Sequence, residues 1–407
     1  MGFLRRQMIT AALTANALRP ARGVRSGIPS FAAGWLTTEL APHLLTATAV
    51  DAAVSTARGR GSRLGYLLAG ASAVGLAALV RESGRAQGLV AGALDADLGP
   101  DYLQALETPP SPADLATPWR RLVNPFRMRE PRVKVIRGIA YGPAGRRNEL
   151  DLYLPSEGPS TGAPVLLQVH GGAWTIGNKE QQGVPLMQHL AAKGWVCVAI
   201  NYRLAPRDRF PAQIVDVKRA IAWIRENIAD YGGDPEYLAI TGGSAGGHLT
   251  ALAALTPDDP TLQPGCEDAD TTVQVAVPHY GVYDMAGASG LKTAIAMRDG
   301  FLARRVFPRS WEDDPEAYEA ASPLLRITPD APDFFVIHGT NDTLVSVEQA
   351  RLFVERLRET SKRTVVFAEL PGTQHAFDIF PSIRSAHVVR AIDRYLHWHW
   401  NTWRQQR

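Results

Sequence analysis

The sequence predicts an α/β fold, a mostly parallel sheet of eight strands with helices on both faces. Eight short apolar runs, rich in β-branched and aromatic residues, lie between residues 133 and 370. From the third run onward a helical pattern usually separates neighbouring runs, as at 214–228 and 347–357. Strands that alternate with helices are typical of parallel sheets. A composition of 45% hydrophobic and 20% charged residues permits such a core and excludes a wholly disordered chain.

The eight runs differ in how they are connected. The first two have no helical pattern between them, so we expect them to pair antiparallel at one edge of the sheet. Ligands of open α/β sheets meet the loops at the carboxyl ends of the strands, so functional residues are sought there. In chain order the predicted strands are 133–141, 150–155, 164–170, 195–202, 237–242, 273–281, 333–339 and 364–370.

The chain divides into three parts by composition. Residues 1–90 form an apolar, arginine-rich region, 91–132 a linker, and 133–407 the domain that contains the eight apolar runs. The first 63 residues have eight arginines, no lysine and two acids, hence a net charge of +6, whereas the whole chain carries only +3. A total this small does not indicate a nucleic-acid partner. The arginines are Arg5, Arg6, Arg19, Arg22, Arg25, Arg58, Arg60 and Arg63.

The N-terminal region contains a candidate membrane segment. Residues 64–80 are 17 uncharged residues between Arg63 and Arg81, at the lower edge of what spans a bilayer. An earlier apolar stretch, 31–57, is interrupted by two acids and a proline. Together they predict a helical hairpin in or on a membrane, or alternatively a pair of packed soluble helices. The expected location is therefore the membrane or cell envelope, and otherwise the cytoplasm.

The first residues also loosely resemble an export signal. Arg5 and Arg6 stand where a twin-arginine pair would, and residues 15–17 have the small side chains of a cleavage site. The apolar run between them has only about seven residues, too few for a good signal. A basic surface arm that contacts anionic lipid headgroups is the favoured interpretation.

The fifth predicted strand leads into a candidate nucleophile. It is followed by Gly242-Gly243-Ser244-Ala245-Gly246 and then by a helical pattern. This G-x-S-x-G in a strand–turn–helix context is typical of a nucleophile elbow. The glycines at 242 and 246 leave room for a tight turn, which exposes the Ser244 hydroxyl above the sheet.

The third predicted strand leads into a candidate oxyanion hole. The loop reads His170-Gly171-Gly172-Ala173-Trp174. Ester hydrolysis passes through an oxyanion that needs preorganised N–H donors. Together with the amide of Ala245, those of Gly171 and Gly172 are the predicted donors. His170 is expected to hold the loop by hydrogen bonds.

A serine nucleophile needs a base and an orienting acid, which follow it in this order of the chain. His375 lies just after the last predicted strand, whereas the other histidines far enough downstream, at 387, 397 and 399, lie on a C-terminal helical stretch. Asp342 lies just past the seventh strand, while Asp333 is at its wrong end. Asp378 follows the histidine too closely for the triad order, although it can form a local hydrogen bond. The predicted triad is Ser244, Asp342 and His375.

These motifs resemble the hormone-sensitive-lipase-like group of bacterial carboxylesterases and lipases. Besides the two glycine loops, the resemblance includes Asn201–Pro206, Phe210–Ala212, Gly232–Pro235 and the segments around the acid and base, over about residues 134–398. It implies an α/β-hydrolase fold with a helical cap. The basic extension more loosely resembles membrane- or envelope-associated lipases of actinobacteria. This comparison rests partly on the excess of arginine (37) over lysine (6), which is typical of GC-rich genomes.

Three positions depart from the family pattern. Ala173 replaces the third glycine of the oxyanion loop, Gly243 the acid before the nucleophile, and Arg207 the glutamate after Tyr-Arg-Leu-Ala-Pro. These changes concern substrate choice more than mechanism. By resemblance, the cap comes from about 85–130 and 285–325. The aromatic residues of the second segment either line an acyl pocket or close the cap core: Phe301, Phe307, Trp311 and Tyr318.

The sequence thus predicts a serine carboxylester hydrolase, an esterase or lipase, for short- to medium-chain acyl esters. A membrane surface is the second expected partner, through the N-terminal region. An aryl-formamide or other amide hydrolase is the alternative within the same fold, and a non-catalytic binding protein is disfavoured because all three triad members are present. No cofactor or metal is implied, and the two cysteines have no zinc-site neighbourhood. The oligomeric state is not predicted.

Overall fold

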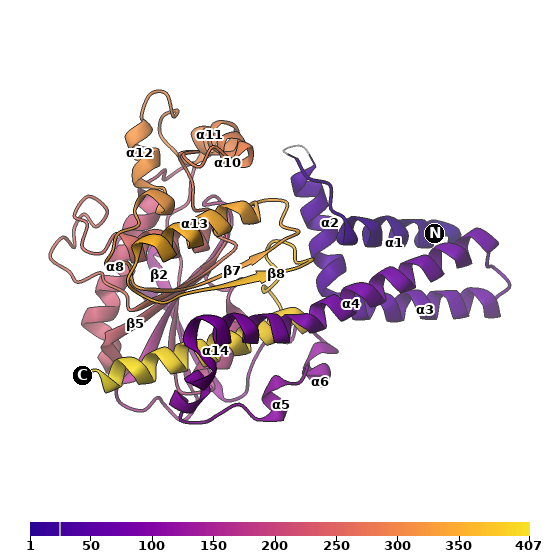
Figure 1. Cartoon of the computed structure of the whole chain (residues 1–407), viewed down its shortest axis with the longest axis horizontal. Helices are drawn as coiled ribbons and strands as arrows, with labels where there is room; N and C mark the ends of the chain where they lie inside the picture. The colour runs from indigo at the N-terminus through magenta and orange to yellow at the C-terminus, as the bar shows by residue number, and fades with distance from the viewer. Residues whose placement is uncertain (24–25) are drawn as a thin grey trace.

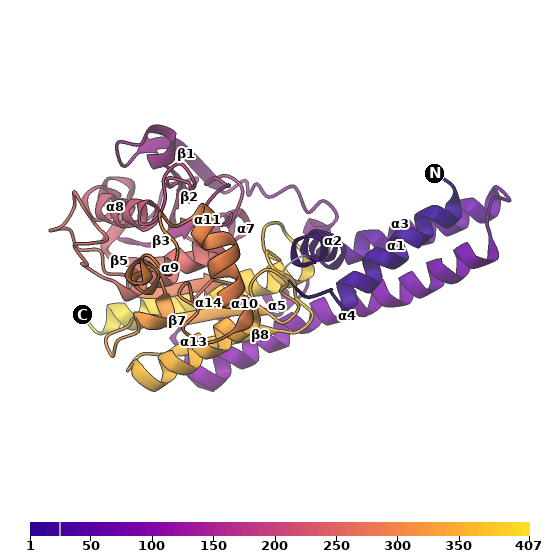
Figure 2. The ribbon, with the colours of Figure 1, turned by 90° about the horizontal axis from the view of Figure 1, so that it is seen from above.

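The computed structural model describes residues 1–23 and 26–407, so Arg25, one of the eight arginines noted above, lies outside the described residues. The described chain has two visibly different parts (Figure 1). A body of mixed strands and helices contains the sheet, and a bundle of helices from the N-terminal region projects from it. The view from above shows the same projection (Figure 2).

The sheet confirms the predicted fold class. It has eight strands in the order β1-β2-β4-β3-β5-β6-β7-β8. As predicted, β1 pairs antiparallel with β2 at one edge, and β2 also pairs antiparallel with β4, whereas the remaining neighbours are parallel. The strands are β1 (Val133–Ala140), β2 (Glu149–Pro155), β3 (Ala163–Val169), β4 (Val196–Ile200), β5 (Gly233–Gly243), β6 (Val275–His279), β7 (Asp333–Gly339) and β8 (Val365–Leu370).

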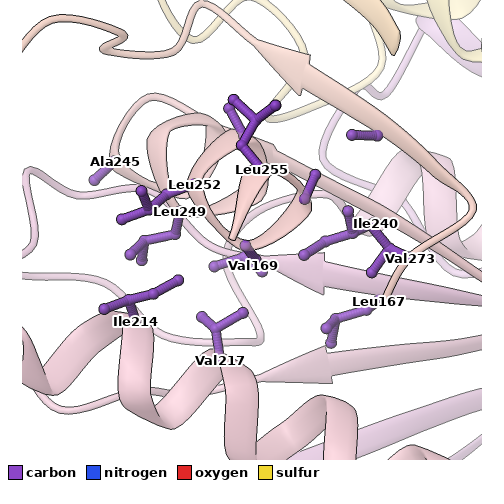
Figure 3. Packing of buried hydrophobic residues seen from close by; sticks show 14 of the residues in the cluster. Leu167, Val169, Ile214, Val217, Ile240, Ala245, Leu249, Leu252, Leu255 and Val273 are labelled. Carbon is purple, nitrogen blue, oxygen red and sulfur yellow. The ribbon is translucent and has the colours of Figure 1, made fainter. Parts of the chain in front are cut away.

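Alternate residues of the strands enter two separate cores. On one face Leu167 and Val169 of β3 pack with α8 (Ala212–Asn227) and α9 (Ala245–Leu255), as Figure 3 shows. On the other face Leu166 packs with residues of α7 (Val184–Ala191) and α14 (Ile383–Gln405). Since neighbouring side chains of a strand point to opposite faces, a fully apolar strand is buried on both sides. The helix α13 (Val347–Thr360) adds Phe353 to the first core.

Four helices form the N-terminal region. They are α1 (Phe3–Leu18), α2 (Gly27–Glu39), α3 (Ala41–Ala57) and α4 (Arg63–Leu98). In the projecting bundle, α1 and α3 lie beside the first half of α4 (Figures 1 and 2). The packing is close because small residues face the neighbours: a Cβ on Gly75 would lie 2.6 Å from Thr14 of α1.

The second half of α4 belongs to the body instead. It packs along α14 and β8, and its Val90 and Leu94 are fully buried in the core that contains α14. The boundary expected at residue 90 therefore falls inside one continuous helix of 36 residues. Because a helix is a rigid connection on this scale, the bundle and the body share a structural element rather than a linker.

The segment between α4 and the sheet lies along α14. It consists of η1 (Pro100–Ala105), α5 (Pro112–Leu115) and α6 (Trp119–Leu122). Asn401 of α14 donates to the carbonyl of Ala105, and Thr117 contacts His387. The segment therefore packs on α14, the helix that covers one face of the sheet. Which of its residues belong to a cap stays a prediction.

The second expected cap segment is a set of short helices. They are α10 (Lys292–Met297), the π-helical turn η4 (Arg298–Leu302), α11 (Ala303–Arg305) and α12 (Pro315–Ala320). Phe307 and Tyr318 are fully buried, with ring centroids 3.8 Å apart. These two aromatics therefore close the core of the segment. The remaining short helices of the body are η2 (Gly145–Asn148), η3 (Ile228–Tyr231) and η5 (Pro323–Leu325).

Candidate active site

The predicted nucleophile occupies a strained turn. Ser244 lies between the end of β5 and the start of α9, and its backbone has φ 59° and ψ −121°. A positive φ is unfavourable for a residue with a Cβ and marks nucleophile elbows. A Cβ on Gly242 or on Gly246 would lie 2.5 or 2.2 Å from the carbonyl oxygen of Val169. Only glycine fits at both flanking positions, as the sequence motif indicates.

The predicted acid and base are in contact. Asp342 follows β7, His375 follows β8, and Nδ1 of the histidine lies 2.6 Å from Oδ2 of the aspartate. Both side chains are buried. The other carboxylate oxygen of Asp342 accepts from the amides of Leu344 and Val345, at 2.9 and 2.8 Å. The carboxylate is thus fixed in position and can fix the histidine in turn.

A second histidine, His338, contacts the same carboxylate. Its Nε2 lies 3.2 Å from Oδ2 of Asp342 and 3.0 Å from the carbonyl oxygen of Val345. Burial acts to raise the pKa of Asp342, but the charge of His375 and the hydrogen bonds from both histidines outweigh it and hold this pKa well below its usual range. We did not predict His338. Its position four residues before the acid, near the end of a strand, is the only sequence signal.

The nucleophile and the base are linked through Tyr280. The ring centroids of Tyr280 and His375 are 4.6 Å apart, and a Cβ on Gly243, next to the nucleophile, would lie 2.5 Å from the tyrosine hydroxyl. Within the described part of the chain, Ser244 Oγ makes no hydrogen bond. Catalytic hydrogen bonds in ligand-free enzymes are often long and tighten only around the substrate.

Tyr280 belongs to a second buried cluster behind the elbow. Its hydroxyl donates to Asp378, and Nδ1 of His279 contacts the other oxygen of this carboxylate. The carbonyl of His279 accepts the amide of Ser244 at 3.0 Å. Asp378 therefore makes hydrogen bonds to His279 and Tyr280, a cluster that the sequence pattern did not reveal because its partners are about 100 residues apart.

The oxyanion loop lies beside the nucleophile but differs from the prediction at one residue. A Cβ on Gly171 would lie 3.2 Å from the Cβ of Ser244. The amide of Gly171, however, donates to Oε1 of Gln182 at 2.7 Å, so this N–H is engaged. In residues 1–23 and 26–407, no acceptor takes the amides of Gly172, Ala173 or Ala245. Spacing in the sequence does not show that Gln182 folds back onto the loop.

Histidines near the loop have structural surroundings. The ring of His170 stacks on Tyr202 with centroids 4.2 Å apart, and burial lowers its pKa to about 4. Trp174 donates from Nε1 to His248, whose pKa burial also lowers to about 4. Uncharged imidazoles that serve as hydrogen-bond partners hold the loop against β3 and α9, consistent with the role expected for His170.

Comparisons with known proteins agree with this geometry. A family model described as BD-FAE matches residues 150–357. The chain is 46% identical to the probable carboxylic ester hydrolase LipM of Mycobacterium tuberculosis, over 95% of this chain and 91% of the relative. It is 51% identical to the esterase LipQ of the same organism, over 63% of this chain and 61% of that protein.

A solved structure provides an independent comparison. The apo form of Thermogutta terrifontis esterase 2 superposes with a TM-score of 0.54 at 25% identity, over 65% of this chain and 92% of that one. The matched part corresponds in size to the body, which carries the strand ends described above. Since LipM is matched over nearly its full length and this solved structure is an esterase, the chain belongs to the hormone-sensitive-lipase-like esterase family and is a carboxylic ester hydrolase.

Proposed function

We propose that Ser244 is the nucleophile of a serine esterase in which His375 is the base and Asp342 orients it. In the first half of the reaction Ser244 Oγ attacks the ester carbonyl while His375 Nε2 takes the hydroxyl proton. The tetrahedral oxyanion collapses, the bond to the alcohol breaks, and His375 gives the proton to the leaving alcohol. The observation that carries this proposal is the 2.6 Å Asp342–His375 contact, which Tyr280 connects to the strained Ser244 elbow.

The second half of the reaction releases the acid. His375 removes a proton from water, which attacks the acyl-serine carbonyl, and the proton then returns to Ser244 as the ester bond breaks. Asp342 stays ionised throughout, which its lowered pKa supports. We assign two of the oxyanion donors to the amides of Gly172 and Ala245. Because the amide of Gly171 bonds Gln182, we assign the third donor to Ala173.

Replacement of the nucleophile tests the mechanism. We expect Ser244→Ala to lower kcat for p-nitrophenyl butyrate about 10⁴- to 10⁶-fold, because the triad acts as a unit. The variant also loses labelling by a fluorophosphonate probe. Ser156→Ala, at an exposed serine of the body, is the matched control and keeps both. Full activity in Ser244→Ala contradicts the assignment.

We expect the preferred substrates to have short to medium acyl chains. A series of p-nitrophenyl esters from acetate to decanoate measures this preference. An N-formyl aryl amine in the same panel measures the amide hydrolase alternative. A turnover of the amide that exceeds that of the butyrate ester contradicts the ester assignment. Faster turnover of a long-chain ester, p-nitrophenyl palmitate, than of any member of the series contradicts the chain-length proposal.

We also propose that the projecting bundle inserts into a lipid bilayer. The helix α4 is long and apolar enough to cross a membrane. Its outward face is apolar over residues 64–80, with Leu67 and Val74 71% and 73% exposed. The inward face has small residues, as helices that pack in membranes do. Arg58 and Arg63 lie at one end of this stretch and Arg81 at the other, about 25 Å apart along the helix.

Flotation with phospholipid vesicles tests the membrane partner. We expect the full chain to float with the vesicles, and Leu67→Glu with Val74→Glu to weaken partition about 100-fold or more, because charge at bilayer depth is costly. Leu325→Glu, at an exposed leucine of the body, is the control and floats like the parent. A full chain that remains in solution without detergent and does not float contradicts the proposal.

A further inference from the structure

The helix α2 lies between the bundle and the sheet, where it meets the loop that carries the catalytic acid (Figures 1 and 2). Thr343, next to Asp342, donates from Oγ1 to the carbonyl of Gly27 at 2.9 Å. A Cβ on Gly27 would lie 2.7 Å from the carbonyl oxygen of Thr343. The start of α2 therefore packs against this loop at backbone contact distance, which only glycine permits.

The middle of α2 meets the loop that carries the base. The rings of Phe31 and His375 pack in a T-shaped arrangement, with centroids 5.9 Å apart and planes at 82°. One turn later, a Cβ on Gly34 would lie 3.5 Å from the side chain of Gln374. Oε1 of Gln374 accepts the amides of both Thr343 and His375 at 2.9 Å. The helix thus packs on the side chain that ties the acid loop to the base loop.

The end of α2 is fixed by a buried ion pair. The carboxylate of Glu39 accepts from Ser382 at 2.6 Å and from Arg384, at the start of α14. All three residues are buried, with Glu39 4% and Arg384 1% exposed. Separation of a buried ion pair leaves an uncompensated charge and is strongly unfavourable. This end of α2 therefore stays docked beside the loop that holds His375.

An aromatic row backs the base loop. Trp35 stacks on Phe31 with centroids 5.8 Å apart, and it contacts Phe380 at 5.6 Å. The Asp342 contact fixes one nitrogen of His375 but leaves the ring free to tilt about that hydrogen bond. Tyr280 and Phe31 are the aromatic rings that pack against the imidazole and restrict this tilt.

We propose that α2 is part of the active site, with Phe31 as the positioning residue that holds the His375 ring in line with Ser244. The inference rests on the proposed role of His375 as the base. Proton transfer needs hydrogen-bond alignment, and a misplacement of about 1 Å costs up to about 100-fold in rate. The same N-terminal region that carries the bundle thereby sets the rate of ester hydrolysis.

The test is the kinetics of Phe31 variants of the full chain on p-nitrophenyl acetate, whose small acyl group limits effects on binding. We expect Phe31→Ala to lower kcat about 10- to 100-fold with KM within about twofold. Phe31→Tyr keeps the ring edge and retains kcat. Phe31→Leu keeps most of the apolar volume, so it folds even where alanine does not, and it still loses kcat.

Leu36→Ala is the matched control on the same helix, because its side chain is 42% exposed. It should behave as the parent. A Phe31→Leu variant with unchanged kcat overturns the inference, since a side chain that only fills space would give this result. A change in KM alone also overturns it, since a side chain that contacts the substrate instead of positioning His375 would give that result. Failure of the parent itself to hydrolyse the ester would instead overturn the proposed function.

Discussion

At the residue scale, Asp342 is the group on which the site depends most. It receives His375 and His338 on one oxygen and two amides on the other. An ionised carboxylate with four partners is much better stabilised than a free one, so its protonation opposes folding. The free energy of unfolding therefore depends on whether Asp342 is ionised, and hence on pH.

We predict that Asp342→Asn lowers kcat about 10⁴-fold, because an amide no longer fixes the imidazole tautomer or stabilises the imidazolium. The measurement is kcat for p-nitrophenyl butyrate near neutral pH. His397→Asn is a suitable control, since this histidine lies on α14 and contacts Asp393 there. A loss of less than about tenfold contradicts the assigned role.

We also predict that Asp342→Asn makes the stability of the protein less dependent on pH. The folded pKa of Asp342 is lowered, so its contribution to stability is fully present above the ordinary value of about 3.9 and is lost as the pH falls below it. Urea unfolding of the parent should therefore weaken between about pH 5 and pH 3 more steeply than that of Asp342→Asn. Equal slopes for the two proteins contradict the prediction.

At the element scale, two glycines of α4 allow this helix to pack closely against α1. Gly65 and Gly75 face α1, where added Cβ atoms would lie 2.7 Å from Phe3 and 2.6 Å from Thr14. Gly70 stands between them on the same helix, and nothing lies within 4 Å of its added Cβ. Two of these glycines therefore pack against α1, whereas the third has no such neighbour. The apolar run itself does not show this difference.

We predict that Gly75→Leu destabilises the bundle by about 1–3 kcal/mol, because overpacking forces α1 away. Gly70→Leu, its control on the same helix, should be neutral or slightly stabilising, since leucine favours helix over glycine. Limited proteolysis of the α3–α4 connection in detergent, where Arg58 and Arg60 are exposed, measures the difference. Equal protection of the two variants contradicts the packing described here.

At the scale of the whole molecule, the N-terminal region and the body form one structure. The helix α4 runs through both, α2 contacts the acid and base loops, and Glu39 pairs with Arg384 inside the protein. This arrangement connects the proposed membrane bundle directly to the active site. Under the two proposals above, substrate from a lipid phase would reach a base, His375, that α2 holds from the side of the bundle.

We predict that a chain beginning at residue 91 does not retain normal activity. It lacks α2 and the first 28 residues of α4, so the loops of Asp342 and His375 lose their packing partner and core surface becomes exposed. We expect kcat at least about tenfold lower and a lower melting temperature. Gel filtration, melting curves and ester kinetics measure this. A truncated chain with the activity and Tm of the full chain contradicts it.

Local sequence patterns were sufficient to predict the eight strands, the antiparallel edge and the contact between the predicted acid and base. These features depend on local patterns: apolar runs set strands, and glycines at 242 and 246 set the elbow. The exact ends of the strands shifted by a few residues, as at β5, which begins at Gly233.

The contacts between groups from distant segments became visible in the folded structure alone. Gln182 takes the amide of Gly171, His338 joins Asp342, and α2 reaches His375 from more than 340 residues away. Such contacts depend on how helices pack and where loops fold back, and no local pattern records them. The site's chemistry is thus encoded in short motifs, whereas its positioning is a property of the packed molecule.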